Sequence, residues 1–445
     1  MILDGKLAQR VVVVGYGRTG RSVVRFLKVF APESTVSVSE RTMLPEQDRR
    51  FLREQGIGFE QGGHRAEFLG SADLIVLSPG VPATLPVLEP LREQGIPVIS
   101  ELDLAAEEIS PRRIIAVTGT NGKTSTVELI TRLLCRSGHS AVAAGNIGTP
   151  LAERLIPPVE AEVFVVEASS FQLEQCVRFR PHVAVWLNLT PDHLVRHGSM
   201  SSYAAAKMKI FAHQQAGDFR IVPSELVEAV SQSGIRVVRF AASQIAGGHG
   251  WAWLTRLPTH MRHNLAAAVA ACGSMDDSFR LEEEDEAIVR DVAALPYRQQ
   301  TLPPIRGVQI INDSKSTNAG SAIAAVVSIS HPVVLMLGGR EKHGGYDRLF
   351  DELRTRADRL RGLVVFGEAG QMFAEMASEI GIPAARLRWV AALSEAVDAA
   401  LELAHSGDTI LFSPGCSSFD RFRDYLQRGA EFTTLIDERR RTVRR

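Results

Sequence analysis

The residues with the clearest chemical signature form a glycine-bearing loop, Gly119-Thr120-Asn121-Gly122-Lys123-Thr124-Ser125. An apolar run, residues 114–117, precedes the loop, and a helical pattern of apolar residues follows it. Backbone N–H groups in such a loop can surround phosphate oxygens, and the N-terminus of the next helix adds a positive dipole end. Lys123 is placed to reach the terminal phosphates, and the Thr124 hydroxyl is placed to bind Mg²⁺. The loop therefore predicts ATP binding; the alternative is an ordinary turn with an exposed lysine.

Polar residues that could hold a cation follow two later apolar runs. Glu167 ends a predicted strand, and a carboxylate at the carboxyl end of a strand in the phosphate-loop sheet is well placed to bind Mg²⁺. Asp192, His193 and His197 follow the next run and are residue types that bind metal or phosphate. A zinc site is a second interpretation of this trio, although no cysteine or regular histidine spacing supports it. The alternatives are an exposed strand-terminal glutamate and a hydrogen-bonded structural histidine.

A second glycine pattern, Gly15-x-Gly17-x-x-Gly20, follows an apolar run, and Glu40 lies about twenty residues further on. This pattern matches the dinucleotide-binding fingerprint and, taken alone, indicates an NAD-dependent oxidoreductase. Because the chain also carries a separate phosphate loop, we favour two nucleotide-handling domains. The remaining alternative is a tight strand–helix turn without a ligand.

The elements that must position these residues alternate between strand and helix, which implies parallel sheets built from right-handed crossovers. We predict three α/β domains: a Rossmann-like domain (residues 1–98), a central P-loop ATPase-like domain with a parallel sheet (99–295) and a C-terminal Rossmann-like domain (296–445). An alanine-rich helix should follow Asn264, and residues 247–254 suggest a turn into an edge strand. The strands are expected at residues 11–14, 35–39, 74–77, 97–99, 114–117, 163–166, 183–187, 220–222, 308–311, 333–337, 363–366 and 409–412.

The composition bounds the class of protein. The chain has 445 residues and a formal net charge of −1, so no global charge favours nucleic acid. Its four cysteines form neither a close pair nor a metal-binding spacing, which is typical of free thiols in a reducing compartment. No apolar run approaches the ~20 residues that span a bilayer, and the N-terminus lacks a signal-peptide core. We expect a cytoplasmic monomer without membrane insertion; the basic end, residues 439–445, is an anion patch or a solvated helix terminus.

Several further motifs stand in an order and spacing that resemble the Mur ligase family. They are Ser78-Pro79-Gly80, Asn146-Ile147-Gly148, Glu167-x-Ser169-Ser170-Phe171-Gln172-Leu173, Asn188-x-Thr190-x-Asp192-His193-Leu194, Asn312-Asp313-Ser314-Lys315-Ser316-Thr317-Asn318 and Ser413-Pro414-Gly415-Cys416-Ser417-Ser418-Phe419-Asp420. With the phosphate loop and the N-terminal glycines, the resemblance covers all three predicted domains. It implies an ATP-dependent ligase that adds D-glutamate to UDP-N-acetylmuramoyl-L-alanine in cytoplasmic peptidoglycan precursor synthesis.

The chemistry that this resemblance implies has two steps. The acceptor carboxylate attacks the γ-phosphorus of ATP to give an acyl phosphate and ADP, and the incoming amine then displaces phosphate. Because the first step brings two anions together, it requires cations. Folylpolyglutamate synthase is an alternative that would not need the N-terminal domain, and a diaminopimelate-adding ligase would show an Asp-Asn-Pro-Arg motif that this chain lacks. A regulatory P-loop protein, which hydrolyses ATP without an amine acceptor, is a third.

The resemblance also implies roles for individual residues. The catalytic set is Lys123, Glu167, His193, Lys207 and Lys315. Thr124 and Glu167 would bind one Mg²⁺, and His193 would serve a second, supported by a carbamate that CO₂ forms on Lys207. The carbamate has an electrostatic reason, because an unmodified lysine is a cation that would repel the metal.

The remaining implied contacts fall into three groups. The nucleotide would meet Gly119, Thr120, Asn121, Gly122, Lys123, Thr124, Ser125, Asn264, Arg298 and Asp313. The UDP substrate would meet Gly17, Arg18, Thr19, Glu40, Arg41, Ser78, Pro79, Gly80 and Asn146. Glutamate would meet Thr317 and Lys342 at its α-carboxylate, and Ser418, Phe419 and Tyr425 at its side chain. Lysine, hydroxyl groups and backbone donors suit a dicarboxylic amino acid.

Overall fold

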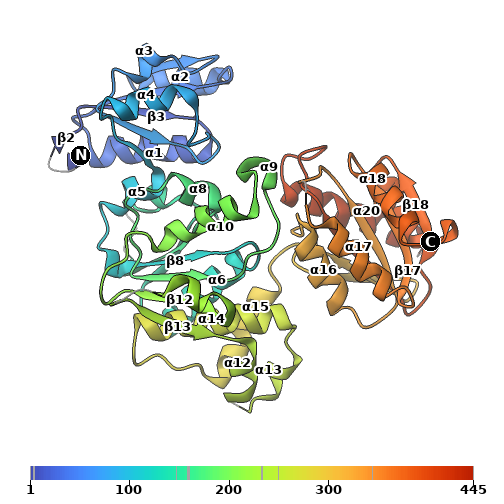
Figure 1. Cartoon of the computed structure of the whole chain (residues 1–445). Coiled ribbons are helices and arrows are strands. Elements are labelled where there is room, and N and C mark those ends of the chain that lie inside the picture. Colours follow the sequence, from blue (N-terminus) through green and yellow to red (C-terminus); the bar gives the residue numbers. More distant parts are fainter. Residues whose placement is uncertain are drawn as a thin grey trace. The chain divides into compact units, whose positions relative to one another are not determined.

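A computed structural model of the chain describes residues 2–3, 6–146, 148–157, 161–231, 234–248, 250–342 and 344–443 (Figure 1). These residues form two compact units. The first comprises Met1–Asn188, Ala204–Thr255 and Arg262–Asp285, and the second comprises Leu189–Tyr203, Arg256–Met261 and Glu286–Arg445.

The first sheet of the first unit carries the glycine fingerprint. Its strands are parallel, in the order β5-β4-β3-β6-β7. They are β3 (Arg10–Val14), β4 (Thr35–Glu40), β5 (Gly58–Gln61), β6 (Leu74–Leu77) and β7 (Val98–Ser100), with α1 (Arg18–Phe30), α2 (Glu46–Glu54), α3 (Ala66–Leu69), η1 (Pro86–Leu88) and α4 (Glu89–Glu93) between them. The valine run of β3 is buried because a central parallel strand is covered on both faces. All four predicted strands are confirmed, whereas β5 and the short hairpin of β1 (Ile2–Leu3) and β2 (Lys6–Leu7) were not predicted.

The second sheet of this unit carries the phosphate loop. It is also parallel, in the order β13-β12-β11-β8-β10-β9. Its strands are β8 (Ile114–Thr118), β9 (Ala141–Gly145), β10 (Val163–Glu167), β11 (Val183–Trp186), β12 (Phe219–Pro223) and β13 (Arg236–Phe240). Glu167 lies in register with Val117 on the neighbouring β8. Glu167 and the phosphate loop therefore lie together at the carboxyl ends of these two parallel strands. The four predicted strands are confirmed; β9 and β13 were missed.

Helices precede, connect or follow the strands of this second sheet. They are α5 (Glu101–Ala106), η2 (Pro111–Arg113), α6 (Lys123–Arg136), α7 (Leu151–Arg154), α8 (Ser170–Gln175), α10 (Met200–Met208), η3 (Lys209–Phe211), η4 (Ser224–Leu226), α11 (Val227–Val230), α12 (Ala242–Gly248), α13 (Ala252–Arg256), α14 (Thr259–Met275) and η5 (Glu283–Asp285). The alanine-rich helix is confirmed as α14. The edge strand predicted at residues 247–254 is wrong, because α12 and α13 occupy this region and Trp253 and Leu254 are buried on a helix. His249, within that prediction, lies outside the described residues.

The second unit is built on a mixed sheet in the order β14-β15-β19-β16-β17-β18, in which only β14 runs antiparallel among the described strands. Its strands are β14 (Gln300–Ile305), β15 (Val308–Asn312), β16 (Val333–Gly338), β17 (Leu360–Phe366), β18 (Leu387–Val390) and β19 (Thr409–Gly415). The helices are α9 (Leu194–His197), α15 (Glu286–Ala293), α16 (Ala319–Ser328), α17 (Tyr346–Thr355), α18 (Gly370–Glu379), η6 (Ala384–Arg386), α19 (Leu393–Leu403) and α20 (Tyr425–Val443). The four predicted strands are confirmed, and the edge strands β14 and β18 were missed.

The core of the second unit lies on both faces of its sheet. Along β16, Leu335 and Leu337 pack with residues of α16, α17 and α18, whereas Val334 and Met336 pack with residues of α19 and α20. This alternation follows the period of two of a β-strand, and burial on both faces explains the continuous apolar run. The predicted α/β architecture is therefore confirmed, with the antiparallel β14 as an addition.

Three expectations from composition concern the chain as a whole. All four cysteines are free. Within the described ranges, no helix is long and apolar enough to cross a membrane. The basic end continues α20, and Arg439 pairs with Asp398 at 2.7 Å, which favours the helix-terminus interpretation. Arg444 and Arg445 lie outside the described residues.

Candidate active site

The phosphate loop joins β8 to α6 in a conformation that glycine adopts without strain. Gly122 has a φ of +84°, and a Cβ atom at this position would collide with the side chain of Asn264. The Lys123 Nζ atom donates hydrogen bonds of 2.8 Å to the carbonyl oxygens of Gly119 and Thr120. The ammonium group is thus folded back over the loop. A close backbone, a helix N-terminus and a cation fit a nucleotide phosphate.

Glu167 forms the acidic part of this site at the end of β10, where it is 2% exposed. Its Oε2 atom accepts a hydrogen bond of 2.8 Å from the Thr124 hydroxyl, and its Oε1 atom accepts one of 2.8 Å from Asn146 Nδ2. The structure therefore brings together three residues predicted from separate motifs. A hydroxyl and a carboxylate are oxygen ligands of the kind that Mg²⁺ prefers. Ile147, which follows Asn146 in its motif, lies outside the described residues.

Two side chains from other elements fix the loop. Asn188 Oδ1 accepts hydrogen bonds from the N–H groups of Thr120 (3.1 Å) and Asn121 (2.9 Å), and Asn188 Nδ2 donates to the Asn121 carbonyl at 3.1 Å. Lys207, from α10, is 1% exposed, and its Nζ atom donates to the Gly119 carbonyl at 2.8 Å. Lys207 therefore lies at the phosphate loop, which its sequence context alone did not indicate. The role of Asn188 was missed, although its place after the strand next to β8 was a usable signal.

The N-terminal glycine fingerprint forms a tight turn between β3 and α1. Gly15 has a φ of +89°, and a Cβ atom on Gly20 would collide with the Gly15 carbonyl oxygen. The Ser78 hydroxyl donates a hydrogen bond of 2.6 Å to that same carbonyl. Ser78, predicted as a substrate contact, thus closes the turn from the end of β6.

Glu40 stands at the carboxyl end of β4 beside this turn. Its Oε2 atom accepts a hydrogen bond of 2.7 Å from the Tyr16 N–H, and its Oε1 atom accepts bonds of 3.1 Å from the N–H and hydroxyl of Thr42. Burial raises the pKa of Glu40, but these hydrogen bonds outweigh it and hold the pKa below its ordinary value. Arg18 and Arg41 are exposed nearby in sequence. Glu40 therefore remains an acceptor that orders the backbone of the turn.

A cavity of about 270 Å³ next to the turn is lined by Arg18, Arg21, Arg25, Thr149, Pro150 and Glu153. Arg21 pairs with Asp48 at 2.5 Å, and Arg25 pairs with Glu153. Arg21 and Arg25 were not predicted as site residues. Their spacing with Arg18 along one face of α1 was the available signal.

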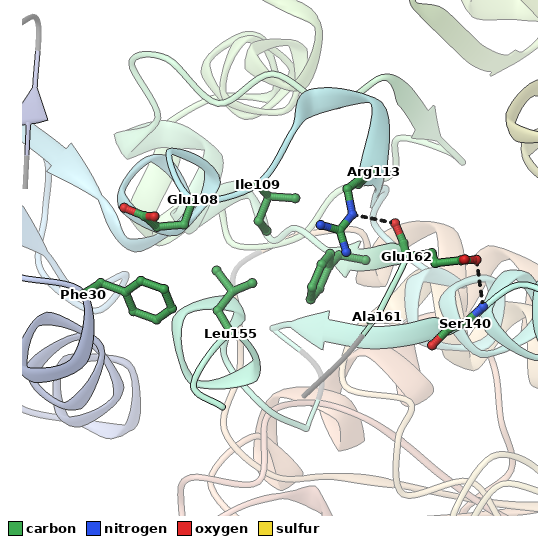
Figure 2. A pocket seen from close by; sticks show the side chains of 9 residues that line it. Phe30, Glu108, Ile109, Arg113, Ser140, Leu155, Ala161 and Glu162 are labelled. Atoms are coloured by element: carbon green, nitrogen blue, oxygen red, sulfur yellow. Dashed lines mark hydrogen bonds between the residues drawn. The ribbon is translucent and has the colours of Figure 1, made fainter. Parts of the chain in front are cut away.

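A larger cavity, of about 600 Å³, opens at the amino ends of the strands in the sheet that carries the phosphate loop. It contains no predicted site residue. It is lined by Phe30, Glu108, Ile109, Arg113, Ser140, Leu155, Ala161, Glu162 and Phe164. Figure 2 shows Arg113 Nε donating to the Glu162 carbonyl (2.9 Å) and the Ser140 N–H donating to the Glu162 carboxylate (3.3 Å). Arg113, Ser140 and Glu162 each directly precede a parallel strand. Because such sheets bind ligands at the carboxyl ends of their strands, we do not assign this cavity to the active site.

In the second unit, the buried carboxylate of Asp192 contacts Lys342, which in turn contacts Thr317; both of these residues are predicted to bind glutamate. Asp192 Oδ1 lies 3.3 Å from Lys342 Nζ, and Asp192 Oδ2 accepts a hydrogen bond of 2.9 Å from Asn318 Nδ2. Lys342 Nζ also lies 3.4 Å from the Thr317 hydroxyl. His193 follows in the left-handed conformation, with a φ of +56°, and its N–H donates to Asp192 Oδ1 at 2.8 Å. The family resemblance implied the roles of Lys342 and Thr317 but did not indicate their link to Asp192.

The described residues contain no group of three or more histidine, cysteine, aspartate or glutamate side chains placed to hold a metal ion. The zinc interpretation of Asp192, His193 and His197 therefore gains no support. Of the predicted Mg²⁺ ligands, Thr124 and Glu167 belong to the first unit and His193 belongs to the second.

Asp313, a predicted nucleotide contact, is buried in the second unit. Its carboxylate accepts hydrogen bonds from the hydroxyl groups of Ser316 (2.7 Å) and Ser413 (2.9 Å) and from the Gln299 N–H (3.1 Å). Burial raises the pKa of Asp313 to about 6, although the hydrogen bonds and the nearby charge of Arg298 oppose the shift. Arg298 is therefore close enough to Asp313 for its charge to act on the Asp313 carboxylate.

Lys315 and the start of α20 meet in the same unit. Lys315 Nζ lies 4.2 Å from the centre of the Tyr425 ring, a cation–π contact. Arg428, which is fully buried, donates to the carbonyl oxygens of Ser314 (2.9 Å) and Cys416 (3.0 Å) and thereby fixes both segments. Arg428 was not predicted as a site residue. Of the other predicted glutamate contacts, Ser418 is buried and Phe419 is exposed.

Models of protein families match the chain in three successive regions. The model described as Mur ligase MurD-like, N-terminal domain matches residues 9–100. The Mur ligase middle domain matches residues 117–271, and the Mur ligase, glutamate ligase domain matches residues 297–416.

Individual relatives extend over nearly the whole chain. A UDP-N-acetylmuramoylalanine–D-glutamate ligase from Koribacter versatilis is 36% identical, covering 96% of this chain and 97% of its own. An enzyme of the same name from Pelotomaculum thermopropionicum is 35% identical, with the same coverage. Among solved structures, the MurF ligase from Thermotoga maritima in complex with ADP is 16% identical, with a TM-score of 0.54, and covers 96% of this chain and 95% of its own. This last likeness confirms the three-domain fold.

Proposed function

The chain belongs to the Mur ligase family, and on this basis we propose that it uses ATP to join D-glutamate to UDP-N-acetylmuramoyl-L-alanine. The observation that carries the proposal is the combination of relatives of that name over nearly the whole chain with an ordered phosphate loop. In this loop Lys123 bonds to backbone carbonyl oxygens and Thr124 donates a hydrogen bond to Glu167. The products would be the amide, ADP and phosphate.

The reaction needs a leaving group, because an ionised carboxylate does not undergo attack by an amine at neutral pH. The acceptor carboxylate attacks the γ-phosphorus of ATP, and an acyl phosphate and ADP form. The glutamate amine then attacks the acyl carbon, and phosphate leaves from the tetrahedral intermediate. Lys123 would neutralise the β- and γ-phosphates, and Lys315 would neutralise the transferring phosphoryl group.

We propose that Thr124 and Glu167 hold one Mg²⁺ and that His193 serves a second. Bound Mg²⁺ would screen the charge of the phosphates and of the acceptor carboxylate. The hydrogen bonds to Glu167 from Thr124 and Asn146 support the first site, since they fix the carboxylate before any metal binds. His193 must be neutral to act as a ligand, so acidic pH should weaken the second site.

Lys207 is proposed to carry the carbamate. Its amine, buried against the Gly119 carbonyl, would place a positive charge beside the metal site if it remained unmodified. The ammonium first loses one proton to give the neutral amine; the amine then forms an N–C bond with CO₂ and loses a second proton, which leaves a carbamate anion in its place. The short distance between Lys207 and the phosphate loop supports this assignment over one to Lys209, whose Nζ donates to the Glu174 carbonyl instead.

The two other substrates would bind at the remaining predicted residues. The UDP group would meet the fingerprint turn with Gly17, Arg18 and Thr19, together with Glu40, Arg41, Pro79, Gly80 and Asn146. The glutamate α-carboxylate would meet Lys342 and Thr317, and its side chain would meet the region of Ser418, Phe419 and Tyr425. The nucleotide would also contact Asn264, Arg298 and Asp313. We further propose that the enzyme is a cytoplasmic monomer in peptidoglycan precursor synthesis, and hence in the maintenance of cell shape and in cell division.

The test is phosphate release with ATP, Mg²⁺ and UDP-N-acetylmuramoyl-L-alanine, in the presence of D-glutamate, L-glutamate or neither. We expect release that requires D-glutamate. Phosphate release with L-glutamate but not with D-glutamate would support the ligase assignment and change the amino acid that the enzyme adds. Hydrolysis of ATP alone, unaffected by either substrate, would overturn the ligase assignment in favour of a P-loop switch, and NADH titration would test the oxidoreductase alternative.

A further inference from the structure

Asp192 links the proposed glutamate-binding cation to the backbone of the second unit, and we propose that it is a positioning residue for glutamate. This inference rests on the proposed function. Asp192 is 7% exposed and contacts Lys342 at 3.3 Å. Its role would be to hold the Lys342 ammonium beside the Thr317 hydroxyl, so that both groups meet the same substrate carboxylate.

The Asp192 carboxylate is itself held from two sides. Asn318 Nδ2 donates to Oδ2 at 2.9 Å, and the His193 N–H donates to Oδ1 at 2.8 Å. Asn318 is in turn the N-cap of α16, where its side chain accepts a hydrogen bond of 2.8 Å from the Ser321 N–H. The amide of Asn318 therefore joins Asp192 to a helix N-terminus. A carboxylate fixed in this way can orient a flexible lysine, whose side chain otherwise loses much rotamer entropy on binding.

The orientation of Lys342 follows from its two partners. Of the three N–H groups of its ammonium, the described residues engage two, through Asp192 and Thr317, and the third remains for a carboxylate from solution. The Lys342 side chain is 18% exposed, so this position can be reached by a small solute. The ion pair with Asp192 thus orients the Lys342 ammonium and leaves it able to bind a carboxylate of glutamate.

The test compares steady-state kinetics of the wild type, Asp192→Asn, Lys342→Ala and the double variant. Asp192→Asn keeps the shape of the side chain and removes its charge. We expect the KM for D-glutamate to rise about tenfold, with the KM for ATP within about twofold of the wild type. In the Lys342→Ala background, Asp192→Asn should change the glutamate KM less than about twofold further, because Asp192 acts through Lys342. Asp351→Asn, an exposed carboxylate paired with Arg354, is the matched control.

Two results would overturn the inference. A lower glutamate KM in Asp192→Asn would mean that the carboxylate competes with substrate for Lys342. If the rise in the glutamate KM of the double variant equalled the product of the rises in the two single variants, Asp192 and Lys342 would act independently. If Asp192→Asn loses its fold by circular dichroism, Asn318→Asp replaces it, since this variant keeps the N-cap, repels Asp192 and should raise the same KM. A wild type without D-glutamate-dependent phosphate release would instead refute the proposed function, whereas an active wild type with an unchanged KM in the variant refutes the inference alone.

Discussion

Two buried carboxylates, Glu167 in the first unit and Asp192 in the second, are held by different kinds of donor. Glu167 accepts hydrogen bonds from a hydroxyl and an amide, Thr124 and Asn146. Asp192 accepts from the amide of Asn318 and also lies against the ammonium of Lys342. Glu167 is the last residue of β10 and Asp192 follows β11 in the sequence, yet the two residues belong to different units.

This difference in hydrogen-bond donors bears on the chemical role that is proposed for each carboxylate. Glu167 is oriented by the Thr124 hydroxyl and the Asn146 amide, and both of its carboxylate oxygens would face the proposed Mg²⁺ as ligands of the kind that this ion prefers. A carboxylate paired with lysine is already compensated, so it serves to orient that lysine instead. These contacts lead to different proposed roles for the two carboxylates, a metal ligand and a positioning residue, and substitutions of the neighbouring lysines and hydroxyls test that difference.

The largest effect should come from Lys123→Ala, which removes the cation of the phosphate loop. The Lys123 ammonium bonds to two carbonyl oxygens of the loop, and the proposed function assigns its charge to the β- and γ-phosphates of ATP. We expect turnover to fall by about 100- to 1,000-fold, as when one charge-stabilising donor is removed from an active site. Phosphate release measures the loss. An unfolded variant, with the exposed Lys28→Ala folded and active as control, would show that Lys123 is structural.

A third buried carboxylate, Asp313, tests the comparison through pH. Its hydroxyl and N–H donors are neutral, and burial raises its pKa to about 6. Since the folded pKa exceeds that of the unfolded chain, near 3.8, the folded state binds more protons between these values, and stability falls as pH rises from about 4 to about 6. The shift corresponds to at most roughly 3 kcal/mol. Urea unfolding should show that this loss is absent from Asp313→Asn; parallel pH profiles of the two proteins would contradict the assignment.

Lys207→Ala tests whether a carbamate anion on Lys207 supports the proposed binding of the second Mg²⁺. The variant lacks the amine that would form the carbamate, and we expect activity to fall by about 50- to 100-fold. Short-chain carboxylic acids added to the assay should restore part of it by supplying the missing anion. Lys209→Ala is the matched control, since Lys209 lies two positions away and bonds to the Glu174 carbonyl. Full activity of Lys207→Ala without added acid would remove the carbamate from the mechanism.

The sequence was sufficient for the buried parallel strands, and it failed mainly at the edges of the sheets. The valine run of β3 and the apolar run of β16 are covered on both faces, so their composition alone identifies them. The missed strands β5, β9, β13, β14 and β18 are edge strands with partly exposed or polar positions, and proline occurs within β14. Residues 247–254 were misjudged because glycine followed by tryptophan suggested a turn into an edge strand, whereas α12 and α13 occupy this region and bury Trp253 and Leu254.

The candidate site was predictable where the chemistry lies within one motif. The phosphate loop gave Lys123 and Thr124 from local spacing. The partners that cross between motifs, such as Asn188 with the loop and Asp192 with Lys342, depend on which strands and helices become neighbours. Their residue types are common, so only the three-dimensional arrangement distinguishes them from ordinary polar residues. Arg428 gave no local signal at all, because its function is to fix two distant segments.

The smallest effect should come from Thr317→Val, which removes one neutral donor beside Lys342 and keeps the shape of the side chain. The Thr317 hydroxyl lies 3.4 Å from Lys342 Nζ, a long contact, while the ion pair with Asp192 remains in the variant. Loss of one hydrogen bond to a charged substrate group with the cation still oriented should raise the KM for D-glutamate about three- to fivefold and change kcat little. Steady-state kinetics with D-glutamate varied would measure this split. If the increase instead matched or exceeded that of Asp192→Asn, the hydroxyl rather than the ion pair would direct the lysine, and the distinction drawn between the two buried carboxylates would fail.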